Sequence, residues 1–361
     1  MPRKAIIIGG GIGGLATAVH LRSSGWNVEV RERAPAPPGT GTSVGLWPAA
    51  LRALDELGVG RAARERARPA VRGNFLRSDG RLIGNVDFAG LRRRTGDTVH
   101  VIARPALFET LTAALDDGVV RYGQDVTDVR PLTDSTDCDV VIAADGLRSR
   151  ARAVLFGDRH GPRYSGVTAW HGTVDLGTEA ISETWGQGVR FGVTPRAGGH
   201  SNWFACAPAP ERVPVPGGDL VALQRYFGTW HPGVRRVLDR VAEGGGAGIS
   251  RNDLYDLAEP LPSYVSGRVA LIGDAAHAMT PDLGRGACEA LIDAVTLAGE
   301  LTARARVEDA LAAYDTARRR PTQRLARAAR LMNRAVHTRR PLAPVRNAAM
   351  RLFLTVGRPP A

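Results

Sequence analysis

The sequence predicts an α/β fold, and three observations support this prediction. The apolar run Lys4–Ile8 leads into GGGIGG and a helical pattern that ends at Gly25, which is typical of a βαβ opening. A second strand-to-helix pattern spans residues 269–301. Between them, residues 164–203 form short apolar segments separated by glycine, a pattern of antiparallel strands. We therefore expect a discontinuous Rossmann-like domain, an inserted and mainly antiparallel β-sheet domain, and a C-terminal helical tail.

The individual elements follow from local patterns. Ser78-Asp79-Gly80 lies between two apolar runs and predicts a hairpin. Because proline lacks a backbone N–H, we expect the C-terminal helix to be broken at Pro321, Pro341 and Pro344. The other predicted elements are strands at 26–32, 98–103 and 138–144 and helices at 48–57, 105–115, 220–227 and 234–241.

These elements interleave, so the predicted domains are built from separate segments. The Rossmann-like domain is expected over 1–70, 96–160 and 265–305, the β-sheet domain over 71–95 and 161–264, and the helical segment over 306–361.

Composition favours a cytoplasmic protein. The 361 residues are 43% hydrophobic and 23% charged, the N-terminus lacks the apolar core of a signal peptide, and no apolar run reaches the roughly 18 residues of a membrane span. The cysteines Cys138, Cys206 and Cys288 are far apart and form no CxxC, which favours buried thiols over disulfides or a metal site. The sequence does not distinguish a monomer from a homodimer.

The net charge of +12 comes largely from residues 304–361. A solvated face of a docked helix explains these arginines without a nucleic-acid partner, and an anionic-membrane or nucleic-acid surface is the alternative. Four of them recur at helical spacing opposite three apolar residues: Arg320, Arg324, Arg327 and Arg334, against Leu325, Ala328 and Met332.

The first chemical motif is Gly9-x-Gly11-x-x-Gly14, between a predicted strand and a predicted helix. Gly9 permits a tight turn, Gly11 lets a diphosphate approach the backbone, and Gly14 lets the helix pack on the strand. Glu32 ends the next strand, where an acid can bond ribose hydroxyls. These residues predict a dinucleotide site, and they do not choose between NAD and FAD.

Further motifs make that choice: GGGIGG with Glu32-Arg33, WPAALRAL at 47–54, RPAL at 104–107, AADGLRSRAR at 143–152, YSGVTAWHG at 164–172, ETWGQGVRFG at 183–192 and GDAAHAMTPDLGRGA at 273–287. In this order they resemble the class A flavoprotein monooxygenases, the family of p-hydroxybenzoate hydroxylase, salicylate hydroxylase and zeaxanthin epoxidase. The resemblance covers most of the chain and implies bound FAD.

The resemblance also implies roles for individual residues. Asp274 would bond the ribityl chain, and Arg104 would reach toward the FAD. A helix beginning near Gly286 would offer N–H groups to the pyrimidine edge of the flavin. The remaining implied FAD-binding residues are Gly9, Gly11, Gly14, Glu32, Arg33, Asp145, Gly146, Pro281 and Gly284.

In this family NAD(P)H would reduce the FAD, and O2 would add to give a flavin C4a-hydroperoxide that hydroxylates or epoxidises an electron-rich substrate. Because the sequence has no second dinucleotide fingerprint, NAD(P)H would bind transiently. The alternatives are an FAD-dependent reductase or dehydrogenase of the same fold, and a non-catalytic flavin-binding module.

Several positions depart from the family pattern. His171 stands where the motif often has Arg, and charged Asp282 and Arg285 flank the flavin loop without an assigned role. Because the cofactor carries the chemistry, the catalytic candidates are limited to His171, Arg190 and Pro281. We expect His277 to be structural.

The substrate candidates lie on the inserted sheet, which in this fold would cover the flavin. They are His171, Trp185, Arg190, Phe191 and Trp203, with ordinary sheet packing as the alternative for each. The tryptophans and the lack of an evident carboxylate-binding cluster favour a larger, mostly neutral aromatic or terpenoid-like substrate.

Overall fold

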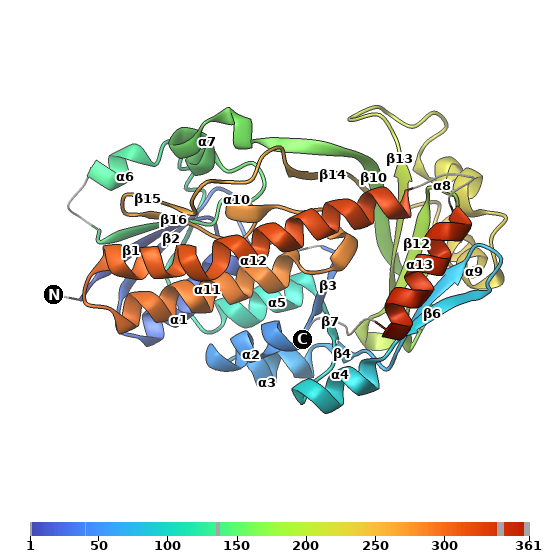
Figure 1. The fold of residues 1–361 in the computed structure, drawn as a ribbon, viewed down its shortest axis with the longest axis horizontal. Coiled ribbons are helices and arrows are strands. Elements are labelled where there is room, and N and C mark those ends of the chain that lie inside the picture. Colours follow the sequence, from blue (N-terminus) through green and yellow to red (C-terminus); the bar gives the residue numbers. More distant parts are fainter. Residues whose placement is uncertain (1, 40, 135–137, 338–342, 357–361) are drawn as a thin grey trace.

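The computed structural model describes residues 2–39, 41–134, 138–337 and 343–356, which form three sheets flanked by helices (Figure 1). The first sheet has the order β15-β16-β9-β1-β2-β8, and every pair except β15–β16 is parallel. Its strands are β1 (Lys4–Ile8), β2 (Asn27–Glu32), β8 (Val120–Tyr122), β9 (Val140–Ala143), β15 (Val265–Ser266) and β16 (Val269–Leu271).

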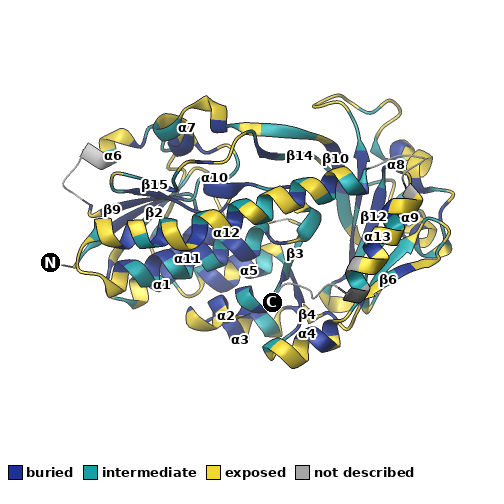
Figure 2. Cartoon of the chain, in the orientation of Figure 1, coloured by how far each residue is buried: buried dark blue, intermediate teal, exposed yellow. Residues whose placement is uncertain are grey.

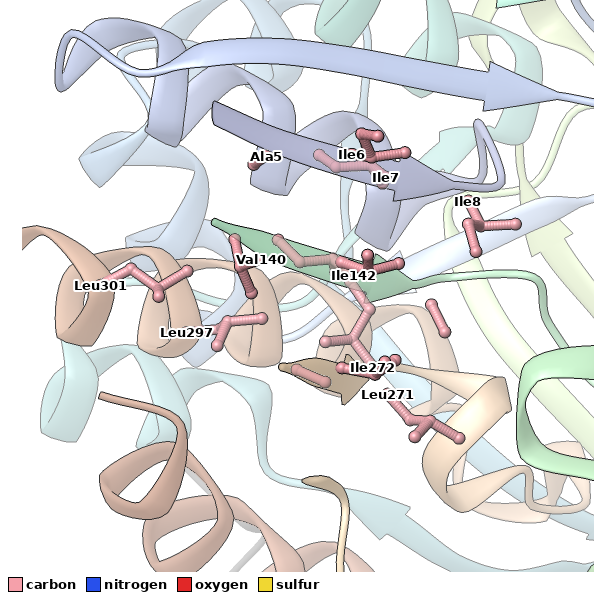
Figure 3. Packing of buried hydrophobic residues seen from close by; sticks show 14 of the residues in the cluster. Ala5, Ile6, Ile7, Ile8, Val140, Ile142, Leu271, Ile272, Leu297 and Leu301 are labelled. Atoms are coloured by element: carbon pink, nitrogen blue, oxygen red, sulfur yellow. The ribbon is translucent and has the colours of Figure 1, made fainter. Parts of the chain in front are cut away.

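The first sheet is buried between helices, which explains its continuous apolar strands. The helix α1 (Ile12–Ser23) packs on α11 (Gly286–Ala303). Figure 3 shows side chains of β1, β9 and β16 beside Leu297 and Leu301 of α11, within one cluster of buried residues. The predicted βαβ opening is therefore present, and the predicted mixed α/β fold class is confirmed.

The second sheet has seven strands in the order β14-β10-β13-β12-β11-β5-β6, and all pairs except β11–β5 are antiparallel. The predicted hairpin forms its β5–β6 edge. The strands are β5 (Arg72–Arg77), β6 (Leu82–Val86), β10 (Pro162–Val174), β11 (Ala180–Trp185), β12 (Arg190–Pro195), β13 (Ser201–Pro208) and β14 (Ser250–Leu257).

The strand β10 is 13 residues long, not one of several short segments as expected. Its pairing with β14 shifts register between Tyr164 and Thr168, so a bulge lets one strand continue from the first sheet toward the second. The bulge contains Gly166, whose φ of +84° suits a residue without a Cβ.

The helices α8 (Asp219–Phe227) and α9 (Pro232–Glu243) cover one face of the seven-stranded sheet. A small third sheet joins β3 (Ser43–Leu46), β7 (His100–Ala103) and β4 (Arg68–Pro69). The other elements are α2 (Pro48–Glu56), α3 (Gly60–Glu65), α4 (Phe88–Thr95), α5 (Arg104–Thr112), α6 (Arg130–Asp134), α7 (Arg150–Phe156), η1 (Asp158–His160), η2 (Ala197–Gly199), α10 (Asp274–His277) and η3 (Pro281–Leu283).

The predicted break at Pro321 is wrong, because α12 (Val307–Val336) continues through this residue. Pro321 is exposed, so the carbonyl that loses its helical hydrogen bond lies on the solvent side of the helix. Pro344 is the second residue of α13 (Ala343–Val356), where a missing N–H costs little, and Pro341 lies outside the described residues.

The three cysteines are buried and free, as predicted. Within the described part of the chain, no helix combines the length and apolar character that a membrane crossing needs.

Candidate functional site

The carboxyl ends of four parallel strands meet at one edge of the six-stranded sheet. β1 leads into Gly9, β2 ends at Glu32, β9 leads to Asp145, and β16 leads to Asp274. The order β9-β1-β2 places the turns after β1 and β9 side by side, with their helices on either side of the switch point. Ligands of doubly wound sheets bind at such a point.

The three motif glycines differ in what surrounds them. A Cβ on Gly9 would lie 2.4 Å from the oxygen of Ala144, and one on Gly14 would lie 2.0 Å from the oxygen of Gly9. Gly9 also has a φ of +102°. A Cβ on Gly11, in contrast, would meet no atom within 4 Å. Gly9 and Gly14 therefore hold the turn together, and Gly11 leaves open space at the N-terminus of α1.

The N-terminus of α1 suits a diphosphate. Gly11 is its N-cap residue and supplies no side-chain cap, so the first N–H groups of the 12-residue helix face this open space. Glu32 accepts hydrogen bonds from the N–H groups of Gly10 (2.6 Å) and Ala34 (2.8 Å), which fixes its carboxylate beside the turn. Glu32 and the exposed Arg33 line a pocket with Gly9 and Asp145.

The turn after β9 has an unused acceptor. Asp145 Oδ2 accepts from the N–H of Ala151 at 3.2 Å, while Asp145 Oδ1 is buried without a partner among the described residues. Gly146 has a φ of +76°, which lets the chain turn sharply there. Sequence reasoning missed Arg152, whose buried guanidinium donates to the carbonyls of Leu147 and Ala275 and so joins this turn to α10.

Asp274 is exposed, yet neighbouring protein groups desolvate it and raise the pKa of its carboxyl, while His277, Arg104 and Arg152 oppose this shift. Arg104 is also exposed and close enough to act on this carboxyl, with its guanidinium 5.6 Å from the centre of the Phe108 ring. This edge of the sheet therefore offers an anionic acceptor and a cation together.

The segment from Pro281 to Gly286 lies beside Asp274, because a Cβ on Gly286 would be 4.0 Å from Asp274 Oδ1. Pro281 and Gly284 are exposed, and Gly284 has a φ of +60° with no atom within 4 Å of a Cβ placed there. α11 begins at Gly286 without a side-chain cap, so its 18 residues direct a positive dipole end and free N–H groups at this space. Two uncapped helices, orphaned Asp145 Oδ1 and the cleared glycine positions fit an extended dinucleotide such as FAD.

Asp282, which had no assigned role, joins the flavin loop (residues 281–286) to the seven-stranded sheet. Its buried side chain lies 3.1 Å from Arg190 Nη2 and accepts from Asn333 Nδ2 of α12 at 3.1 Å. Arg190 also donates to Glu183 Oε1 at 3.1 Å. One buried guanidinium is thus shared by two carboxylates, one from each side of the interface between sheet and loop.

Arg285 belongs to a second buried network, behind the loop. It donates to Glu289 Oε1 at 3.0 Å, and Arg318 of α12 donates to Glu289 Oε2 and to Asp293 Oδ1, both at 2.6 Å. Asp293 Oδ2 accepts from His277 Nε2 at 2.5 Å. The Asp293 carboxylate also accepts from the N–H of Gly273, directly before Asp274. The network thus fixes both ends of the 273–286 segment.

His277 is a structural member of this network. Burial alone would lower the pKa of His277, but the charge and hydrogen bond of Asp293 outweigh it and raise the pKa. Desolvation would raise the pKa of Asp293, but the charges and hydrogen bonds of His277 and Arg318 lower it to about 2. The pairing with Asp293 therefore favours the protonated form of His277.

This arrangement predicts a pH dependence of stability. Because the folded pKa of His277 lies above its unfolded value, its contribution is complete below the unfolded pKa of about 6.5 and is lost as the pH rises through the folded pKa. The difference in the free energy of unfolding between the wild type and His277→Gln, measured with urea, should therefore shrink above pH 6.5. A difference that grows with pH would contradict a raised pKa.

The face of the seven-stranded sheet that bears Arg190 is turned toward the flavin loop, and we call it the inward face. Residues paired directly across antiparallel strands share a face, so Cys206 joins Arg190, and Phe204 lies one row away with His171. The Phe204 ring covers Gly192, where a Cβ would lie 2.1 Å from a ring carbon. Phe204 and His171 are only half-buried, and the Phe204 ring lies against Arg190, which contacts Asp282 of the flavin loop.

Two substrate candidates lie on the other face. Phe191 and Trp203 stack on each other and pack in the cluster under α8 and α9, because their neighbours Arg190 and Phe204 occupy the inward positions. Trp185 is on the inward face, but Val336 and Met350 cover it. The prediction that these aromatics line the site does not agree with their packing. Phe204 was missed, because only the pairing of β12 with β13 shows that it shares the face of Arg190.

The start of β3 approaches the same face. Ser43 Oγ accepts a 2.6 Å hydrogen bond from Asn202 Nδ2 of β13. His171 is 3.5 Å from Asn252 Nδ2, and burial lowers the pKa of its imidazole, which makes it neutral at pH 7. Beside the charged pairs of Arg190, this face of the sheet thus presents the Phe204 ring and the polar groups of His171 and Asn202.

Comparison with known proteins supports the FAD assignment. A family model described as an FAD binding domain matches residues 3–187 and 256–329. The chain is 37% identical to an aurachin C monooxygenase/isomerase of Stigmatella aurantiaca, covering 87% of this chain and 84% of the relative. It is 32% identical to an FAD-dependent urate hydroxylase of Klebsiella pneumoniae, covering 87% and 85%. The crystal structure of Klebsiella pneumoniae HpxO with FAD and uric acid superimposes with a TM-score of 0.86 at 27% identity, covering 98% of this chain and 92% of that one.

Proposed function

Because the chain belongs to the FAD binding domain family and is an FAD-dependent monooxygenase like the relatives it matches, we propose that it uses NAD(P)H and O2 to hydroxylate or epoxidise a flat, neutral aromatic substrate. Bound FAD supplies the redox chemistry, accepting a hydride and activating O2. The residues of the chain hold the cofactor and the ring, and they exclude water from the space between them.

The proposed cofactor contacts lie along the carboxyl edge of the six-stranded sheet. The N-terminus of α1 at Gly11 holds the diphosphate, Glu32 the adenosine ribose and Asp274 the ribityl chain. Asp145 Oδ1 accepts a hydrogen bond from the cofactor or from a water that bridges to it. The N–H groups at Gly286 stabilise negative charge on the pyrimidine edge.

The observation that carries the substrate proposal is the compensation of Arg190. Its charge is already shared by Glu183 and Asp282, each at 3.1 Å, so it does not require an anionic substrate. Around it, Phe204 offers a ring face and His171 a neutral imidazole. A carboxylated substrate would bury a third carboxylate beside Glu183 and Asp282, which already share the charge of Arg190, and this is costly. The proposal that the substrate is neutral thus rests on the pairing of Arg190 with two carboxylates and not on the tryptophans of the sheet.

The relatives favour oxygenation over the reductase alternative, because the names of those compared above are monooxygenase and hydroxylase. Arg190 is proposed to fix the flavin loop, which contains Pro281, relative to the substrate through its contact with Asp282. His171 is proposed to form a hydrogen bond with the polar edge of the substrate ring. NAD(P)H is proposed to bind transiently, since the sequence carries a single dinucleotide fingerprint.

A matched pair of compounds tests the substrate proposal. Anaerobic stopped-flow measures the rate of flavin reduction by NADH or NADPH with 2-naphthol or with 3-hydroxy-2-naphthoate, which differ by one carboxylate. The concentration of compound that gives half of the maximal reduction rate should be at least about tenfold lower for 2-naphthol, because the carboxylate of the naphthoate would stay unpaired. Tighter binding of the naphthoate would contradict the proposal, and in that case Glu183→Gln should strengthen its binding further.

A further inference from the structure

The excess positive charge of the chain is confined to its C-terminal segment. Residues 316–361 contain twelve of the 48 Lys and Arg residues and none of the 36 Asp and Glu residues, so the residues before 316 carry 36 charges of each sign. The whole net charge of +12 therefore belongs to this segment. A general preference for arginine would raise the count throughout the chain, and it would not remove every acid from one segment.

The helix α12 divides its arginines between two faces. Arg318 and Arg330 point inward and pair with Glu289 and Asp256. Arg320, Arg324 and Arg327 are exposed, and none of them forms an ion pair with a residue that the structure describes. Their spacing of four and three residues places them on one stripe of the helix. This stripe is not explained by the packing of α12.

Large apolar side chains accompany the stripe. Leu331 follows Arg327 by four residues and is 64% exposed, and α13 adds Val345 and Leu352, which are 65% and 63% exposed. The inner side of α13 packs on Val336 and Trp185 in one cluster, which holds the two helices together. Figure 2 shows exposed residues along α12 and α13 on the same side of the molecule. Leu331, Val345 and Leu352 thus add apolar contact area beside the arginines.

We propose that the stripe Arg320–Arg324–Arg327–Leu331, together with the outer side of α13, docks the enzyme on an anionic phospholipid surface. Lipid phosphates complement the arginines, and the boundary between headgroups and acyl chains accommodates the exposed apolar side chains. Nucleic acid would match the arginines alone and leave Leu331 in water. The inference rests on this surface and is independent of the substrate assigned to the site.

The test uses the full-length, FAD-loaded protein in a vesicle sedimentation assay. The vesicles contain phosphatidylcholine alone or with phosphatidylglycerol as the anionic lipid. The variant R320Q/R324Q/R327Q is compared with R92Q/R93Q/R94Q on α4, where three other exposed arginines lie. Both variants lose three charges, so a general effect of net charge would weaken both equally. Circular dichroism and flavin absorbance check that each variant is folded and loaded.

The wild type should bind the anionic vesicles and not pure phosphatidylcholine, and binding should weaken as salt rises. The α12 variant should lose about 100-fold in binding, since each arginine near the surface contributes roughly fivefold, while the α4 variant stays near the wild type. L331S should weaken binding in high salt more than in low salt. Equal losses in both triple variants, no anionic-lipid preference, or preferential binding of duplex DNA would overturn the proposal.

Discussion

Arg318→Met is expected to lower the free energy of unfolding by about 3–5 kcal/mol. The reason is that Arg318 is the shared partner of Glu289 and Asp293, which are both buried. Without the guanidinium, His277 still pairs with Asp293, and Arg285 still pairs with Glu289, but each carboxylate loses a 2.6 Å charged hydrogen bond. Urea unfolding of the FAD-free protein measures the change.

The neighbouring pair provides the control. Arg319 pairs with Asp315 nearer the surface, so Arg319→Met should cost less than about 1 kcal/mol. The variant that also neutralises both acids, R318M/E289Q/D293N, should recover part of the loss, because it removes the buried charges that lack a partner. If Arg318→Met and Arg319→Met had the same small effect, the network would not be the support of the flavin segment that the geometry indicates.

Gly11→Val should reduce FAD affinity by at least about 100-fold, equivalent to roughly 2.8 kcal/mol, while leaving the protein folded. A side chain at Gly11 meets no atom of the protein within 4 Å and instead fills the space where the diphosphate is proposed to lie. Gly14→Val should prevent folding, since its Cβ would lie 2.0 Å from a backbone oxygen. Fluorescence titration with FAD measures the affinity, and circular dichroism measures the fold.

Gly299→Val is the matched control for Gly11→Val. Gly299 lies in α11, and a Cβ there also meets no atom within 4 Å, but it is far from the proposed diphosphate position in sequence and faces partly toward solvent. It should bind FAD as the wild type does. Unchanged FAD affinity in Gly11→Val would place the diphosphate elsewhere.

The cofactor side of the proposed site could be predicted from the sequence because its signals are local. Gly9, Gly11 and Gly14 follow one strand directly, and Asp145 and Asp274 each follow the end of another. Since parallel strands bring their carboxyl ends to one edge, knowing the strands was enough to gather these residues. The domain boundaries and the roles of individual residues remain predictions.

The substrate side was harder to predict because it depends on which face of a sheet is inward. Strand alternation separates Arg190 from Phe191, but only the docking of α8 and α9 decides which of them faces the flavin loop. The buried networks could not be predicted from the sequence either, because Arg318 lies on another helix, 25 residues after its partner Asp293. The charges at Asp282 and Arg285 acquire a role only through such partners.

The most direct test of monooxygenation follows the oxygen atom. A compound that accelerates flavin reduction is incubated with the FAD-loaded enzyme, NADH or NADPH and ¹⁸O2, and the product is examined by mass spectrometry. Monooxygenation predicts a product that carries one ¹⁸O atom and that does not form without oxygen. An unlabelled product, or the same product under anaerobic conditions, would contradict it and identify a reductase of the same fold.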